Sequence, residues 1–246
     1  MTEHTRISLP AADRSLADVP APLPLGELVP GEGPWEVEIG FGKGRYLLRR
    51  CQEAPETRFL GIEIAGKYQR RFVEKARRRQ LPNWLALRGE ALYLLSAVLP
   101  KRFAQVVHVY FPDPWPKSRH QKRRSFDPET VDLVIGLLAD CGRLLFATDY
   151  LEYGERVYEI LCTYPGLAVL RRDAWEGGPR TNYEAKYEAE GRPILRLEAI
   201  WSAQCAAPLH PHGAIAVLAA TSKEDKQEAT EATEGRAPAP AASTPR

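Results

Sequence analysis

The sequence lacks the features that mark secreted, membrane and disulfide-bonded proteins. Its 246 residues include only four cysteines, Cys51, Cys141, Cys162 and Cys205, which are far apart and form no Cys-x-x-Cys pair. We therefore expect core thiols in a reducing compartment. The chain also contains no continuous apolar stretch of the length that a signal peptide or a membrane span requires. We expect a cytoplasmic protein with no membrane association.

Signatures of other catalytic classes are missing as well. The chain shows no Ser-His-Asp or Cys-His arrangement and no zinc-type spacing of ligands. His210 and His212 lack a third partner, so no metal is expected there, and His108 is interpreted as a core histidine within a strand. The net charge is only +2, so any affinity for nucleic acid must come from local clustering of cations.

What is present is an alternation of short apolar runs with longer amphipathic ones, and no internal repeat. This pattern predicts an α/β fold with a mostly parallel sheet, helices on both faces and a site at the carboxyl ends of the strands. We divide the chain into a Pro-rich extension (1–32), one domain (33–205) and a C-terminal extension (206–246) of low complexity from about 222, and we expect both ends to be mobile. The expected strands are 35–39, 58–64, 84–88, 105–111, 143–148, 167–170 and 194–202, and the expected helices are 44–53, 67–80, 128–141 and 150–164.

A glycine turn follows the first expected strand. Gly40, Gly42 and Gly44 come directly after Glu38, in the order E-x-G-x-G-x-G, and glycines let a ligand approach bare backbone. The third glycine of a dinucleotide site is missing, since position 45 is arginine. The turn therefore fits S-adenosylmethionine better than a dinucleotide, although a plain strand-to-helix turn has the same residues.

Two further acids follow the next two expected strands. Glu63 ends the second strand, where a carboxylate can accept hydrogen bonds from both ribose hydroxyls; the alternative is a surface carboxylate near Lys67. Glu90 follows the third strand, where such folds contact the adenine edge, or it serves as an acid at a helix start. We predict that both bind the cofactor, together with Glu38 and the three glycines.

The run from Val109 to Arg124 carries the most information. Three prolines at 112, 114 and 116 restrict the backbone around Asp113 and Trp115, and five cations follow them. This run combines a rigid carboxylate, an aromatic ring and a basic cluster, a combination that suits the binding of a nucleobase and its phosphates. The alternative interpretation of the same run is a Pro-rich strand exit followed by a solvated charged loop. The cations predicted to meet RNA phosphates are Lys117, Arg119, Lys122, Arg123 and Arg124, with a second basic group from Lys67 to Arg79.

These segments, with Ala147-Thr148-Asp149 and Thr181-Asn182-Tyr183-Glu184, resemble in order and spacing the bacterial tRNA (guanine-N7)-methyltransferase family over residues 30–203. The resemblance implies a class I methyltransferase (Rossmann-like) fold with a seven-stranded sheet whose last strand is antiparallel. It also implies S-adenosylmethionine as methyl donor and a variable-loop guanosine of tRNA (position 46) as substrate. Oligomeric state, monomer or homodimer, is left open.

Carried over by position, the resemblance places Asp113 at the catalytic centre and beside the cofactor. It places Lys117, Asp149, Thr181, Asn182, Tyr183 and Glu184 against the substrate. The family has Asp or Asn where this chain has Glu90, and Lys where it has Asn182, for which Lys186 is near enough in sequence to substitute. From the residues alone, Asp149 has an alternative as a helix cap, and Tyr183 and Glu184 have one as a loop aromatic and a solvated acid.

The predicted chemistry needs no general base, because guanine N7 offers a lone pair and carries no proton. Alignment of N7 with the methyl group is the chief requirement, and Asp113 suits binding the base better than removing a proton. Two other functions stay open. One is transfer to an exocyclic amine of RNA, since Asp-Pro-Trp-Pro is similar to the Asp-Pro-Pro-aromatic loop of amino-methyltransferases, and the other is a non-catalytic RNA-binding α/β module.

Overall fold

The computed structural model describes residues 21–112 and 127–202. The strands are β1 (Trp35–Ile39), β2 (Arg58–Glu63), β3 (Trp84–Arg88), β4 (Ala104–Tyr110), β5 (Leu138–Thr148), β6 (Leu167–Arg171) and β7 (Leu195–Trp201). The helices are α1 (Leu25–Leu28), α2 (Arg45–Glu53), α3 (Gly66–Arg78), α4 (Ala91–Tyr93), the π-helical turn η2 (Leu94–Val98), α5 (Pro128–Ile135), α6 (Leu151–Cys162) and α7 (Asn182–Ala189).

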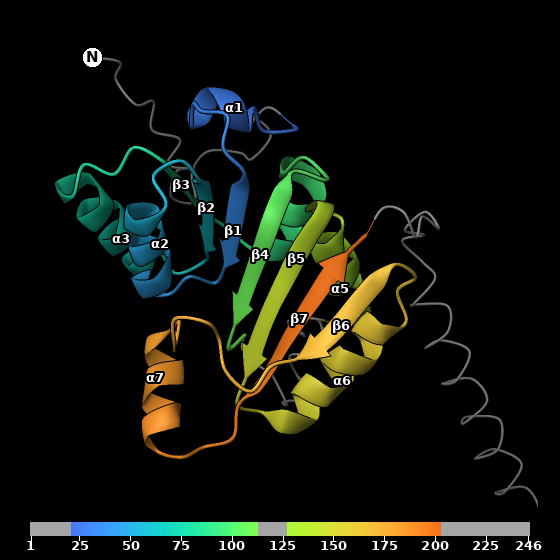
Figure 1. Cartoon of the computed structure of the whole chain (residues 1–246). Helices are drawn as coiled ribbons and strands as arrows, with labels where there is room; N and C mark the ends of the chain where they lie inside the picture. Colours follow the sequence, from blue (N-terminus) through green and yellow to red (C-terminus); the bar gives the residue numbers. More distant parts are fainter. Residues whose placement is uncertain (1–20, 113–126, 203–246) are drawn as a thin grey trace, which may run out of the picture. The chain divides into compact units, whose positions relative to one another are not determined.

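Seven strands form one sheet in the order β3-β2-β1-β4-β5-β7-β6. The pairs from β3 to β5 are parallel, and β7 runs antiparallel to both β5 and β6. The carboxyl ends of β1, β2, β4 and β5 therefore meet at one edge of the sheet, where α7 also lies (Figure 1). Both the mostly parallel sheet and its antiparallel last strand are confirmed.

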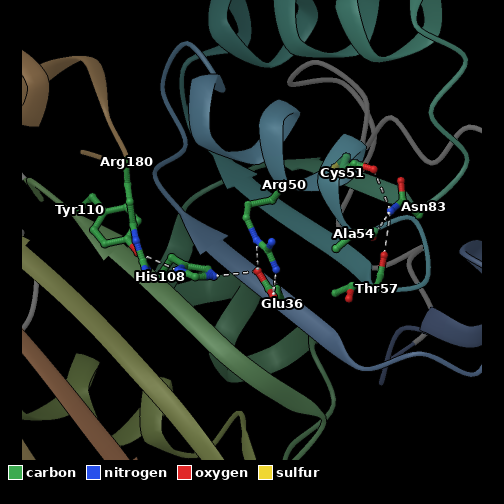
Figure 2. Close-up of polar contacts among 9 residues, drawn as sticks. All are labelled: Glu36, Arg50, Cys51, Ala54, Thr57, Asn83, His108, Tyr110 and Arg180. Carbon is green, nitrogen blue, oxygen red and sulfur yellow. Dashed lines mark hydrogen bonds and ion pairs between the residues drawn. The ribbon is translucent and has the colours of Figure 1, made fainter. Parts of the chain in front are cut away.

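The two faces of the sheet are covered by different helices. α2 and α3 pack on β1 to β3 around a cluster that includes Phe41, Leu47, Phe59 and Phe72, whereas α5 and α6 lie behind the sheet (Figure 1). Asn83, just before β3, donates to the carbonyls of Cys51, Ala54 and Thr57 (Figure 2) and so fixes the end of α2 to the start of β2. Phe41 of the turn between β1 and α2 belongs to the same cluster and packs on Phe72 of α3.

The predicted strands and helices lie within a few residues of their expected bounds, with one error of type, whereas α1, α4 with η2, and α7 were not predicted. The helix predicted over 128–141 ends at Ile135, and Leu138 already pairs with Ala104 of β4 as the first residue of β5. The apolar run from 137 to 139 suits a helix or a strand equally well, so periodicity could not separate them. Within the strand, Gly142 allows a close backbone approach, because an added Cβ there would lie 2.8 Å from the carbonyl oxygen of Ala139 and 2.9 Å from that of Ala104 on β4.

Part of the N-terminal extension packs against the rest of the domain. Leu23, Leu25 and Val29 are buried, and the backbone N–H of Leu23 donates to the carbonyl of Val98. Single apolar side chains between prolines thus anchor this segment without any periodic pattern. Residues 1–20 and 203–246 lie outside the described part of the chain.

The cysteines are only partly core residues. Cys51 is buried, but Cys141 and Cys162 are exposed as free thiols, so the prediction of core thiols is wrong for those two, and Cys205 lies outside the described residues. Cys162 is the last residue of α6 and Cys141 has a positive φ of 57° within β5.

Over residues 21–112 and 127–202, no helix combines the length and the apolar character that crossing a membrane demands.

Candidate functional site

The glycine turn has the backbone that only glycine adopts easily. Gly40, Gly42 and Gly44 have φ values of 74°, 52° and 67°, in the left-handed region. A Cβ on Gly40 or Gly42 would meet no atom of the described residues within 4 Å, whereas one on Gly44 would lie 2.7 Å from the ring of Phe72. The first two glycines thus face open space beside the sheet edge, and the third is needed for packing against α3.

Glu63 holds this turn in place. Its two carboxylate oxygens accept hydrogen bonds from the backbone N–H of Gly42 and of Ala65, each at 2.8 Å, and the side chain is buried. The alternative of a surface carboxylate near Lys67 is therefore wrong. Carboxylate oxygens each have a second acceptor position, so Glu63 can still accept from a ligand that enters the turn.

Glu38 is a buried carboxyl group with an unused oxygen. Its side chain is 4% exposed and its Oε2 has no hydrogen-bond partner among the described residues. Burial, aided by the nearby charge of Glu63, raises the pKa of Glu38 to about 8, although a hydrogen bond from the backbone of Leu47 acts in the opposite direction. Such an orphaned acceptor, next to open space at Gly40, suits a ligand that carries a cation or a hydrogen-bond donor.

Glu90 is the N-cap of α4, where its carboxylate accepts from the backbone N–H of Tyr93 at 3.2 Å. The alternative of an acid at a helix start is thus correct as a description of this side chain. Its second oxygen is not used by that bond. Glu38 near the end of β1, Glu63 at the end of β2 and Glu90 just after β3 belong to three adjacent strands, which places all three at the same edge of the sheet.

The segment Thr181–Glu184 is the start of a helix that the sequence analysis missed. Thr181 caps α7 by accepting from the backbone N–H of Glu184 at 3.0 Å. Glu184 is completely buried, with one oxygen accepting from Arg196 Nε at 2.7 Å and the other from the backbone N–H of Arg180 at 2.8 Å. The alternatives of a loop aromatic and a solvated acid are wrong for this segment. The T-x-x-E spacing of a capping box would have been the signal.

Asn182 has a cationic neighbour that sequence spacing did not suggest. Its side-chain oxygen accepts from Arg45, the first residue of α2, at 3.1 Å. Lys186, the expected substitute for the missing lysine, instead lies 3.7 Å from Glu190 along the same helix. The guanidinium of Arg45 thus joins the glycine turn to α7 across 137 positions of sequence.

Asp149 is joined to the same helix. Arg192 contacts Asp149 at 2.5 Å, and its guanidinium carbon lies 3.9 Å from the ring centre of Tyr187 on α7. The N-cap of α6 is Tyr150, whose backbone N–H bonds to Thr148, so the alternative of Asp149 as the side-chain cap of that helix is wrong.

An aromatic cluster closes this side of the sheet edge. The ring centres of Phe111, Tyr183 and Tyr187 lie 5.7 to 6.3 Å from one another, and Tyr183 is 61% exposed. Phe111 follows β4 with a positive φ of 51°, which is unusual for a bulky residue. An exposed ring beside the end of β4 offers a stacking surface for a base.

The structure therefore brings together every predicted site residue that it describes, at one edge of the sheet. Asp113, Trp115 and the predicted RNA-contacting cations lie outside the described residues. Sequence reasoning missed Arg45, Arg192 and Arg196, because each acts through a partner far away in sequence. The cations outside the described part are Lys117, Arg119, Lys122, Arg123 and Arg124.

Two cavities lie away from this edge. They have volumes of about 230 and 540 Å³ and share Arg143, Leu145, Glu176, Gly177 and Arg180, and none of the predicted cofactor residues lines either of them. In the described ranges, no three His, Cys, Asp or Glu side chains gather as metal ligands would. His108, beside the smaller cavity, is a buried histidine with two hydrogen-bond partners, as predicted.

Comparison with known proteins shows what this arrangement is similar to. Residues 32–197 match a protein family described as "Putative methyltransferase". The tRNA (guanine-N(7)-)-methyltransferase of Nitrosococcus oceani is 33% identical over 177 residues, which cover 72% of this chain and 75% of that protein. The protein of the same name from Leifsonia xyli subsp. xyli is 35% identical over 183 residues, covering 72% and 80%.

Solved structures agree on the fold. The 16S rRNA methyltransferase KamB has a TM-score of 0.53 at 16% identity and covers 72% of this chain and 92% of its own. The aminoglycoside resistance methyltransferase NpmB1 has a TM-score of 0.52 at 19% identity and covers 72% and 91%. At these identities the likeness concerns the fold alone, which is that of class I methyltransferases.

Proposed function

The chain belongs to the tRNA (guanine-N(7)-)-methyltransferase family, and we propose that it transfers a methyl group from S-adenosylmethionine to N7 of a guanosine in tRNA. The observation that carries this proposal is that the residues matched by the family include the residues of the candidate site. The family match over residues 32–197 spans the glycine turn, the three acids and the Thr181–Glu184 helix start. As the target we propose the variable-loop guanosine at position 46, on the family resemblance.

The residues at the glycine turn fit S-adenosylmethionine. Open space at Gly40 and Gly42 admits a ligand against the backbone, and the orphaned Oε2 of Glu38 suits a cationic amino group. Glu63 keeps acceptor capacity for ribose hydroxyls, and Glu90 for the adenine edge. When bound, S-adenosylmethionine supplies an electrophilic methyl group on a sulfonium centre.

For the substrate, this chain has to align a base rather than deprotonate it. Neutral guanine carries no proton on N7, so a lone pair is available without a general base, and correct alignment can contribute on the order of 7–11 kcal/mol. We assign Asp113 to binding the guanine N1 and N2 donors or to stabilising the cation that forms on the imidazole ring. Tyr183, which is exposed, offers a stacking face worth roughly 1–3 kcal/mol.

A basic surface on α3 supports a nucleic-acid substrate. Lys67, Arg70, Arg71, Arg77 and Arg78 are exposed, and in the described part of the chain none of them forms an ion pair. Unpaired cations on one helix attract a polyanion and release counterions when they bind phosphates. α3 begins three residues after Glu63, so the N-terminal end of this helix lies beside the site. Lys117 and the cluster that follows it in sequence are proposed to contact the same RNA.

The surface can be tested by salt dependence. Replacing Arg70 and Arg71 by alanine should reduce the slope of log K for tRNA against log salt by roughly 0.7–0.9 for each phosphate that the protein no longer neutralises. Replacing the exposed Arg156 of α6 is the matched control and should leave the slope unchanged. If the salt dependence of tRNA binding has the same slope in the wild-type protein, in the Arg70 and Arg71 variant and in the Arg156 variant, α3 is not part of the tRNA interface.

The product decides between the candidate reactions. Methylation at N7 puts a fixed positive charge on the imidazole ring, which makes the nucleoside sensitive to borohydride reduction and then to aniline cleavage. We expect labelled methyl to enter tRNA and the strand to break at one guanosine of the variable loop. Incorporation without cleavage would indicate the exocyclic-amine alternative, and tRNA binding without any incorporation would indicate the non-catalytic RNA-binding module. The substrate also supports the proposed cytoplasmic location.

A further inference from the structure

We propose that Arg180 is a positioning residue, which holds the Thr181–Glu184 helix start over the site through a chain of buried hydrogen bonds that runs back to α2. The chain, here called the buried relay, consists of Arg50, Glu36, His108, Tyr110 and Arg180 (Figure 2). The role assigned to Thr181–Glu184 as a substrate contact rests on the proposed function. The geometry of the buried relay does not.

The buried relay crosses two adjacent strands without a gap. Arg50 donates to both oxygens of Glu36 on β1, at 3.2 and 2.7 Å. Glu36 Oε2 lies 3.2 Å from His108 Nε2 on β4, and His108 Nδ1 lies 2.8 Å from the hydroxyl of Tyr110. Nη1 of Arg180 donates to the same hydroxyl at 2.5 Å, which completes the connection from α2 to the loop before α7.

Burial lowers the pKa of His108 and so favours the neutral ring, for which the donors and acceptors along the buried relay fit in one direction. The Tyr110 oxygen accepts from Arg180, so its own proton is free to go to Nδ1 of His108. A neutral histidine that accepts at Nδ1 carries its proton on Nε2 and donates it to the carboxylate of Glu36. Every polar group is then paired inside the fold, where an unpaired one would cost roughly 1–3 kcal/mol. Breaking any link therefore loosens the links beside it.

At its far end the buried relay fixes the backbone that begins α7. The guanidinium carbon of Arg180 lies 4.6 Å from the ring centre of Trp175, 5.3 Å from that of Tyr46 and 5.8 Å from that of Tyr110. The backbone N–H of the same residue donates to the buried carboxylate of Glu184. Three aromatic rings and one hydroxyl thus hold the side chain of Arg180, and this fixes the position of the backbone directly before Thr181.

The sequence before Arg180 shows why such an anchor is needed. Gly177 and Gly178 have φ values of 79° and 78°, so the loop that leads to α7 has a pliable backbone with no regular structure. Without a fixed point, the helix start could swing relative to the glycine turn. α2 is connected to the start of α7 in two ways. Arg45 donates directly to Asn182, and Arg50 is linked to Arg180 through the buried relay. The helix that follows the glycine turn thus also supports the proposed substrate-binding segment.

The test compares two substitutions that each remove one hydroxyl from neighbouring rings. Tyr110→Phe breaks the buried relay and keeps the ring, whereas Tyr46→Phe removes a hydroxyl that is no part of it and is the matched control. We expect Tyr110→Phe to raise the amide hydrogen exchange rate of residues 181–189 at least tenfold and to raise the KM for tRNA at least fivefold. The affinity for S-adenosylmethionine should stay within twofold, and Tyr46→Phe should match the wild-type protein in all three measurements.

A double variant separates positioning from general loosening. If Tyr110 acts through Arg180, the double variant Tyr110→Phe with Arg180→Gln should raise KM no further than Arg180→Gln does alone, whereas independent effects would multiply. Equal exchange rates at 181–189 in Tyr110→Phe and Tyr46→Phe would overturn the inference. If the wild-type protein transfers no methyl to tRNA, the proposed function fails, and the exchange measurement by itself still decides whether the buried relay holds α7.

Discussion

Ionisation of Glu38 should make the ligand-free protein less stable as the pH rises. The pKa of this buried carboxyl is about 8 in the folded protein against an ordinary value of 4.5, so between these two values the folded state binds more protons than the unfolded one. Under that condition the free energy of unfolding falls with increasing pH. Each tenfold change in the ionisation equilibrium corresponds to roughly 1.4 kcal/mol, so full ionisation costs on the order of 5 kcal/mol.

The effect can be isolated by replacing the carboxyl with an amide. From pH 6.5 to pH 8.5 the contribution of Glu38 should lower the free energy of unfolding by roughly 2 kcal/mol, and Glu38→Gln should remove that slope. Urea unfolding of both proteins at several pH values in this range gives the two curves. The variant should therefore gain stability relative to the wild-type protein as the pH rises.

Glu36→Gln serves as the control for this measurement. Burial would raise the pKa of Glu36, but hydrogen bonds from His108 and Arg50 outweigh burial and hold the pKa at about 2. Its titration lies well below the range of the experiment, so Glu36→Gln should lower stability by a constant amount and keep the wild-type slope. Parallel curves for wild-type protein and Glu38→Gln would refute the reasoning, because Glu38 would then be ionised in the folded state at every pH tested.

The remaining predictions concern the glycine turn and the anchoring of α7. Gly40→Val places a β-branched side chain at a φ of 74° and should therefore lower the melting temperature, and it should abolish binding of S-adenosylmethionine in calorimetry carried out below that temperature; retained affinity in a folded variant would contradict the assignment. Gly44→Ala should instead lower the melting temperature, since its methyl group meets Phe72 at 2.7 Å. Glu184→Gln should destabilise the protein by roughly 1–3 kcal/mol in urea unfolding, because it removes one of the two carboxylates that pair with the buried Arg196 and leaves only Glu188, and an unchanged midpoint would show that the pair with Glu184 contributes little.

The sequence alone determined the features that depend on local pattern. Alternating apolar runs predicted most strands and helices, because burial on one or both faces imposes a fixed period on the residues of each element. The glycine turn and Glu63 were found for a similar reason, since a left-handed backbone and a strand-end acid are specified by neighbouring residues. The helix start at Thr181 was within reach of the same reasoning through its T-x-x-E spacing.

The tertiary structure alone decided which distant side chains meet. The pair of Arg45 and Asn182 is separated by 137 positions, and that of Arg180 and Tyr110 by 70. Periodicity shows that a residue faces the core or the sheet edge, but it does not show which side chain that residue contacts. That choice depends on strand order, register and the direction of each crossover, and these are fixed only when the whole sheet packs.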